Sequence, residues 1–193
     1  HTYQVETVEE DDEYLVTMVL DEAYLNSADT VYPLAATISL TVSYAGVDDA
    51  TIYTNNKNPA GSSGSLFVGK NGSNGVGRVL IKFPNLFANN SVLKTQNILS
   101  ATLRVRDLLC ESAQSTIAVN MMKVGWTEST VKCTPTLWNG YDTTFLDQRT
   151  VGLNKGTGRN GTGTGNWYNF NITAAVQAWK GGSYGGQNGN YGV

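Results

Sequence analysis

The clearest pattern in the chain is an alternation of apolar and polar positions over residues 100–108. Leu103 falls on one face of an extended segment, with the apolar residues Ala101 and Val105 two positions away. Arg104 falls on the other face, with the polar residues Thr102 and Arg106. A period of two predicts a β-strand with one dry and one wet face. Residues 79–83 alternate in the same way, and Pro84 follows them, where its missing N–H does least harm. We expect both runs to be central strands of an antiparallel sandwich.

Further β-rich runs flank this pair. We expect strands at residues 2–7, 13–20, 37–43, 50–54, 66–69, 116–123 and 167–170, and in a stretch that ends at Cys133. Residues 139–166 are rich in turn formers, and 152–166 contain six glycines, GLNKGTGRNGTGTG, which predicts a flexible loop. The fold class is therefore all-β, a jelly-roll-like antiparallel sandwich.

One helix is expected near the C-terminal end, at residues 173–180. Thr173 can cap it, and Val176 and Trp179, three positions apart, can face the core. Gly181 and Gly182 would end it. A single helical turn is expected at residues 21–26, and either a surface loop or one helical turn within 85–96.

The sequence divides near residue 46. Two β-rich runs separated by an acidic turn predict an N-terminal hairpin, so we interpret residues 1–46 as the tail of an upstream β unit. Residues 47–193 form the main domain. Tyr191 to Val193 resemble the first residues of a strand, so we expect an unpaired strand edge there and a chain that is part of a longer polypeptide.

Charge and composition narrow the classes of partner. The net charge of −3 and the singly scattered basic residues predict no nucleic-acid partner. No apolar run approaches the roughly 20 residues of a membrane helix. Low charge, at 15%, with many Gly, Asn, Thr and Ser residues is typical of extracellular β proteins.

Catalysis is not expected. His1 is the only histidine, which removes the usual Ser/His and Cys/His arrangements. A glycosidase would need two carboxylates across a cleft. The candidate carboxylates are Glu111, Glu128, Asp142 and Asp147, and nothing in the sequence singles out a pair of them.

Aromatic residues in the polar segment 138–168 suggest carbohydrate binding, because sugar rings stack on flat aromatic faces. The candidates are Trp138, Tyr141, Trp167 and Tyr168. Trp138 and Tyr141, which flank Asn139 and Gly140, are expected to be the most exposed pair. Tryptophans also serve as core anchors, and this is the expected role of Trp126 and Trp179.

Two further sites remain open from the residues alone. Asp48 and Asp49 could offer oxygen ligands to Ca²⁺, with carbonyls of residues 55–65, although hydrogen bonds to loop amides explain the same residues better. No other cofactor is expected. Cys110 and Cys133 permit one disulfide, and the sequence does not decide whether it forms.

An ordered set of motifs resembles the DNRLRE-type domain, a secreted bacterial β-sandwich module, over residues 47–193. The motifs are Asp49-Ala-Thr-Ile, Gly61-Ser, Leu66-Phe-Val-Gly69, Arg78-Val-Leu-Ile-Lys-Phe, Ile98-Leu-Ser-Ala-Thr-Leu-Arg-Val, Trp126-Thr-Glu-Ser-Thr-Val, Phe170-Asn-Ile-Thr and Asn190-Tyr-Gly-Val. Residues 13–43 are similar to the segment that precedes such domains in RHS-type and wall-associated surface proteins. The chain departs from the family at Cys133, where a Trp is usual, and in the long insert 139–166.

The resemblance implies a non-catalytic, extracellular module of a large bacterial surface or secreted protein. Its role would be structural or in attachment, with neighbouring domains or subunits as partners. The alternative is a carbohydrate-binding module, because relatives are implicated in binding polysaccharides such as alginate. Fold alone does not choose between them.

Overall fold

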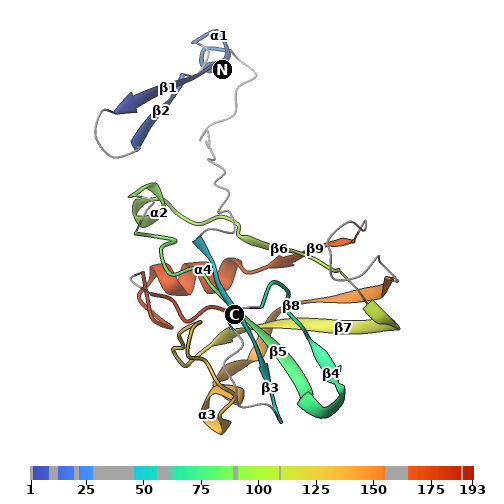
Figure 1. Cartoon of the computed structure of the whole chain (residues 1–193). Coiled ribbons are helices and arrows are strands. Elements are labelled where there is room, and N and C mark those ends of the chain that lie inside the picture. Colours follow the sequence, from blue (N-terminus) through green and yellow to red (C-terminus); the bar gives the residue numbers. More distant parts are fainter. Residues whose placement is uncertain are drawn as a thin grey trace. The chain divides into compact units, whose positions relative to one another are not determined.

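The computed structural model describes residues 2–8, 13–19, 22–27, 46–55, 61, 63–88, 91–108, 110–154, 165–187 and 189–193. Contacts between residues divide the chain into two compact units, His1–Thr41 and Val42–Val193. The secondary-structure elements of both units are labelled in Figure 1.

The smaller unit contains a β-hairpin. β1 (Thr2–Val8) pairs antiparallel with β2 (Glu13–Val19), with Thr2 opposite Val19 and Val8 opposite Glu13. This confirms the N-terminal hairpin. One helical turn follows, α1 (Glu22–Leu25). The strand expected at residues 37–43 lies outside the described residues.

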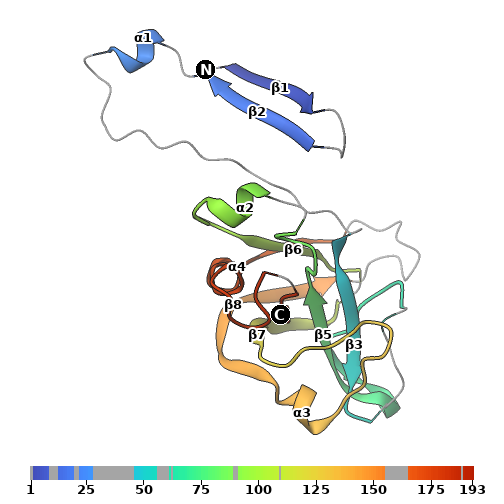
Figure 2. The same ribbon diagram turned by 90° about the vertical axis from the view of Figure 1, so that its left-hand side faces the viewer.

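The larger unit is built from antiparallel ladders. One sheet has the order β3-β5-β4, with β3 (Asp48–Tyr53), β4 (Gly69–Asn71) and β5 (Gly75–Lys82). β6 (Thr102–Arg106) pairs with β9 (Trp167–Asn171), and β7 (Cys110–Met122) pairs with β8 (Tyr141–Asn154). Figures 1 and 2 show these ladders from two sides. The all-β class is confirmed, while closure into a jelly-roll sandwich stays a prediction.

Helices are few and short in the described part of the unit: the 3₁₀ turn η2 (Gly72–Asn74), α2 (Ser91–Thr95), α3 (Pro135–Trp138) and α4 (Thr173–Lys180). α4 has the predicted bounds, and Val176 and Trp179 are buried as expected. Its start differs in detail. The Thr173 N–H donates to Asn171 Oδ1 (3.0 Å), while the Thr173 hydroxyl accepts from the Ala101 N–H (2.9 Å).

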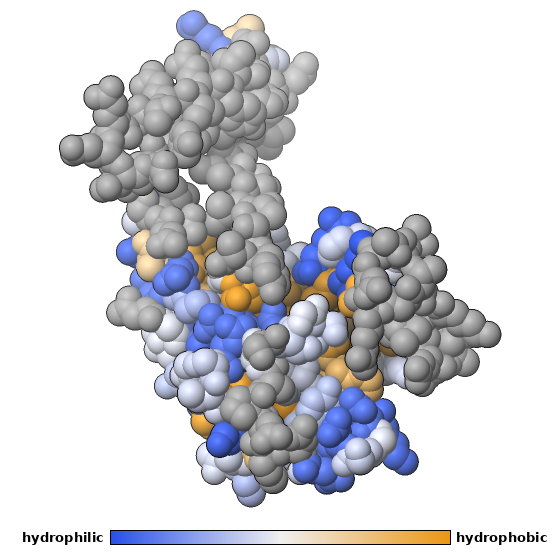
Figure 3. Space-filling view, viewed as in Figure 1, coloured by the Kyte–Doolittle hydropathy of each residue, from blue (hydrophilic) through white to orange (hydrophobic). Residues whose placement is uncertain are grey.

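Two hydrophobic clusters form the core. The first comprises Ala50, Ile52, Leu80, Met122, Trp126, Val131, Cys133 and Leu137. The second comprises Phe87, Leu103, Phe170, Ile172, Ala175, Val176, Trp179 and Val193. The core roles expected for Trp126 and Trp179 are confirmed. On the face seen in Figure 3, hydrophobic residues of this unit show in small groups between hydrophilic ones.

Residues 190–193 connect β5 to β7, so the unpaired edge expected there is wrong. Ile81 and Val193 exchange two backbone hydrogen bonds of 2.9 Å, and the Met122 N–H donates to the Gly192 carbonyl (3.0 Å). Asn190 is fully buried, and its amide donates to the Phe83 carbonyl (2.6 Å) and accepts from the Phe83 N–H (3.4 Å). The segment therefore satisfies backbone groups of strands from two different ladders.

The largest error of the sequence analysis concerns β8, which forms a strand of 14 residues inside the expected turn-rich insert. Its polar residues lack clear alternation, and its pairing with β7 contains register shifts. Tertiary pairing here overrides local preference. Two smaller errors are the strand ending at Cys133, where the expected turn forms at residues 128–130 but 131–133 form no strand, and the strand at 66–69, since β4 begins only at Gly69.

Replacement of Asn190 by Ala should destabilise the protein by about 1–3 kcal/mol, because both backbone groups of Phe83 lose their buried partner. The free energy of unfolding in urea measures this. Asn97→Ala, at an exposed position, is the control and should change it by less than about 0.5 kcal/mol. Equal effects of the two substitutions would contradict the bridging role of Asn190.

Candidate functional site

One face of the β6–β9 ladder is exposed and polar around a single tryptophan. Side chains on this face alternate with buried ones, as the pleat requires. The register pairs Thr102 with Asn171, Arg104 with Asn169, and Arg106 with Trp167. These six residues are called the β6–β9 face below.

Trp167 is the aromatic centre of the β6–β9 face. Its side chain is 53% exposed, although tryptophan carries a large hydrophobic area. The guanidinium carbon of Arg104 lies 4.3 Å from the ring centroid and that of Arg106 lies 5.9 Å away. Both distances fall within the range of cation–π attraction. The arginines therefore hold the indole in place while leaving about half of it in contact with solvent.

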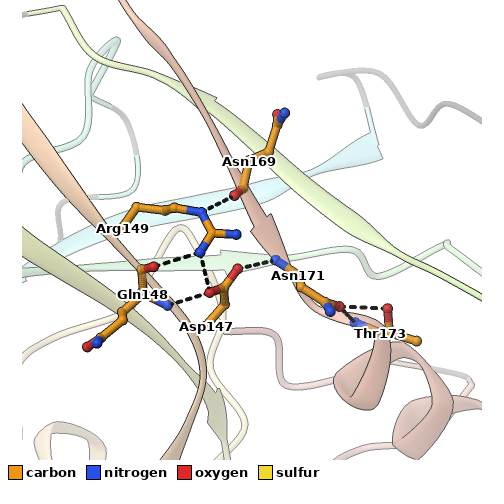
Figure 4. A network of polar contacts seen from close by, with 6 residues as sticks. All are labelled: Asp147, Gln148, Arg149, Asn169, Asn171 and Thr173. Atoms are coloured by element: carbon orange, nitrogen blue, oxygen red, sulfur yellow. Dashed lines mark hydrogen bonds and ion pairs between the residues drawn. The ribbon is translucent and has the colours of Figure 1, made fainter.

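The far edge of β9 is satisfied by side chains of β8 (Figure 4). β6 pairs with one edge of β9, and the other edge needs partners of its own. Asp147 Oδ2 accepts from the Asn171 N–H at 2.8 Å, and Arg149 Nε donates to the Asn169 carbonyl at 2.9 Å. Asp147 and Arg149 also form an ion pair of 2.6 Å. We call this pair the β8 clamp.

The clamp lowers the pKa of Asp147. The main cause is the hydrogen bond that its carboxylate accepts from the Asn171 N–H. The Gln148 N–H (2.7 Å) and the Arg149 guanidinium act in the same direction, while partial burial acts against them. Asp147 is therefore held in its charged form, which is the form that binds both β9 and Arg149.

A shallow hollow of about 190 Å³ lies beside this face. Its lining includes Ser100, Thr102, Arg149, Asn169, Asn171 and Thr173. Pockets for drug-sized molecules usually measure roughly 300–1,000 Å³. The hollow therefore has room for one ring or one substituent group of a larger ligand.

Trp138 and Tyr141 are not the exposed pair that the sequence suggested. Both are partly buried and pack against the first core cluster. The Arg78 guanidinium carbon lies 3.9 Å from the centroid of the Trp138 ring and 4.9 Å from that of Tyr141. Arg78 also donates to the Trp138 carbonyl at 2.6 Å. An arginine of the same chain thus stacks on both rings.

Tyr168 also differs from Trp167, its neighbour in sequence. Its ring packs against the second core cluster, and its hydroxyl donates to Asp107 Oδ2 at 3.4 Å. Of the four aromatic residues that the sequence suggested, the structure brings only Trp167 to an exposed polar face.

The acidic residues near the start of β3 are engaged differently from each other. Asp48 forms an ion pair of 2.9 Å with Lys82, whose ammonium lies 4.8 Å from the centroid of the Trp126 ring. Burial raises the pKa of Asp49, and the neighbouring carboxylates Glu128 and Asp48 raise it further. Among the described residues, no three His, Cys, Asp or Glu side chains gather as metal ligands. A calcium site here stays a prediction.

The predicted disulfide depends on a side chain outside the described part of the structure. Cys133 is buried in the first core cluster. Only the backbone of Cys110 is described, at the start of β7, so the pairing stays a prediction.

No protein-family model matches the chain, and neither a curated protein nor a solved structure does. The likeness to the DNRLRE-type domain stays a prediction for this reason. The candidate site therefore depends on its own geometry.

Sequence reasoning missed Arg104, Arg149, Asn169 and Asn171 as members of the site. The alternation of residues 100–108 already places Arg104 on the wet face of its strand. The pairing of β6 with β9, some 60 residues later, is a long-range contact that no local pattern contains. The β8 clamp depends on a strand that the sequence did not predict at all.

Asp147→Asn should lower the melting temperature near pH 7, because the neutral amide attracts Arg149 less strongly. A lowered folded-state pKa adds stability above the ordinary value of 3.8, and this contribution disappears as pH falls through the lower folded value. The difference in melting temperature between wild type and variant should thus be largest above about pH 5 and shrink in stronger acid. A difference that stays constant from pH 7 to pH 2.5 would contradict this role of the charge.

Proposed function

We propose that the chain is a non-catalytic, extracellular attachment module that binds a polysaccharide through the β6–β9 face. The observation that carries the proposal is the half-exposed indole of Trp167 among polar side chains. The C–H groups of a sugar ring pack against a flat aromatic face, while its hydroxyl groups need hydrogen-bond partners. Asn169 and Arg104 lie beside the indole and can supply those partners.

The charges on the face favour an acidic polysaccharide. Arg104 and Arg106 lie over the Trp167 ring, and Arg149 lies at the far edge of β9. Arginine forms directed, charge-assisted hydrogen bonds to carboxylate and sulfate groups. The chain as a whole carries a net charge of −3, so this attraction is local to the face.

A rigid support is a second argument for binding at this face. β9 is held on one edge by the ladder with β6 and on the other by the β8 clamp. Preorganised groups lose less conformational freedom when a ligand binds, and this improves affinity. The position of Trp167 on a strand is therefore favourable for recognition of an extended chain.

The alternative is a purely structural module that contacts neighbouring domains or subunits. The strand edge that first suggested it is occupied, because Val193 pairs with Ile81. No helix in the described part of the chain is long and apolar enough to span a membrane. A structural module would contact neighbours but would show no affinity for free polysaccharide.

Trp167→Ala should weaken binding to an acidic polysaccharide such as polygalacturonate by about thirtyfold or more. This follows because loss of a central aromatic contact costs about 2 kcal/mol or more. Affinity electrophoresis and calorimetry of the whole chain measure the effect.

Trp138→Phe is the matched control, because it changes a tryptophan away from the β6–β9 face and keeps an aromatic ring beneath Arg78. It should retain wild-type binding. If Trp138→Phe lost affinity and Trp167→Ala did not, the binding face would be wrong. If the wild-type chain bound no polysaccharide, neutral or acidic, the structural alternative would replace the proposal.

A further inference from the structure

The hollow beside the β6–β9 face is lined by hydrogen-bond donors whose directions are fixed by neighbouring residues. Asn171 Oδ1 accepts from both the N–H and the hydroxyl of Thr173, at 3.0 and 2.7 Å. These two bonds identify the oxygen end of the amide, so the NH₂ group is the end available to donate to a ligand. Within the described part of the chain, that NH₂ group forms no hydrogen bond.

Arg149 presents a second oriented donor. Its Nε donates to the Asn169 carbonyl, and its Nη1 donates to Asp147 and to the Gln148 carbonyl. These bonds fix the plane of the guanidinium, as Figure 4 shows. The other terminal nitrogen, Nη2, has no partner among the described residues. Since a guanidinium only donates, this nitrogen needs an acceptor from water or from a ligand.

The strand beside the hollow carries an arginine, but the charge near the hollow itself is partly neutralised. Arg104 is directly opposite Asn169 in the ladder, which places their Cβ atoms about 5 Å apart. Asp147 offsets much of the charge of Arg149, since the two form an ion pair. The charged end of Arg104 lies over Trp167, 4.3 Å from the ring centroid, so selection in the hollow depends on the directed donors themselves.

We propose that this hollow is a second subsite of the glycan face, and that it binds a carboxylate or sulfate group of the polysaccharide. The inference rests on the proposed function, because the same ligand would stack one of its sugar rings on Trp167. Asn171 and Trp167 are four residues apart on β9, which separates them by about 13 Å. The ligand therefore runs along β9, with the stacked ring at one end and the anionic group at the other.

Asn171→Asp tests the subsite in the whole chain. Aspartate keeps the oxygen that accepts from Thr173 and replaces the donating NH₂ group by a carboxylate, which repels an anion. Binding to polygalacturonate should weaken by about tenfold or more. A second variant, Thr102→Val, removes a hydroxyl from the opposite side of the hollow and keeps a β-branched side chain on β6. It should weaken binding by about fivefold, the effect of one hydrogen bond.

Gln148→Glu is the matched control for charge. It adds one negative charge next to Arg149, at an exposed position that points to the other face of β8. Affinity should change by less than about twofold, since exposed charges on opposite faces are screened. A polymer whose carboxyl groups have been reduced to alcohols should bind wild type and Asn171→Asp equally. Binding to dextran sulfate tests the sulfate group. If Asn171→Asp lost affinity for dextran sulfate but not for polygalacturonate, the subsite would be assigned to sulfate.

The outcomes separate the two proposals. If Asn171→Asp and Thr102→Val both bind acidic polymers like wild type while Trp167→Ala does not bind, the subsite is wrong and the glycan face stands. If Gln148→Glu weakens binding as much as Asn171→Asp, the effect is one of general charge and the subsite is again wrong. If wild type binds no polymer, both proposals are wrong.

Discussion

The site depends on a requirement of strand β9, whose backbone needs hydrogen-bond partners along both edges. β6 supplies them on one side as an ordinary antiparallel ladder. On the other side two side chains replace the strand, with Asp147 on the Asn171 N–H and Arg149 on the Asn169 carbonyl. Because these side chains occupy the hydrogen-bonding groups of that edge, β9 can lie next to β8 without joining its ladder.

These and neighbouring hydrogen bonds also orient the donor groups of Arg149 and Asn171 on the exposed side. Three hydrogen bonds, to the Asn169 carbonyl, to Asp147 and to the Gln148 carbonyl, hold the Arg149 guanidinium in one plane. They leave Nη2 as its remaining donor nitrogen. Asn171 is oriented through Thr173 at the start of α4. Trp167 lies farther along β9, under Arg104. The residues that bond the free edge of β9 are therefore in part the same ones that we propose as ligand contacts, so a change in the clamp should also change the β6–β9 face.

Much of the fold follows from local patterns in the sequence. The alternation at residues 100–108 identified β6 and its wet face, and the spacing of Val176 and Trp179 identified the buried side of α4. β8 could not be found in this way, because its residues are mostly polar and its strand conformation depends on pairing with β7. The role of residues 190–193 was likewise invisible, since it arises from contacts with β5 and β7.

The candidate site was predicted only in part. Trp167 was among the expected aromatic residues, but Trp138 and Tyr141 ranked before it because Asn139 and Gly140 suggested an exposed turn. Sequence could not show that Arg78, 60 residues earlier, stacks on both rings. Exposure of an aromatic side chain depends on what packs against it, and that is a property of the folded chain.

The most direct test of the glycan face follows the four tryptophan indole N–H signals by NMR during titration with an oligomer of galacturonate. The account predicts that the signal of the half-exposed Trp167 shifts with ligand concentration. The signals of Trp126 and Trp179, which are buried, and of Trp138, which packs against the first core cluster, should stay in place. A shift of the Trp138 signal with no change at Trp167 would contradict the account and move recognition to Trp138 and Tyr141.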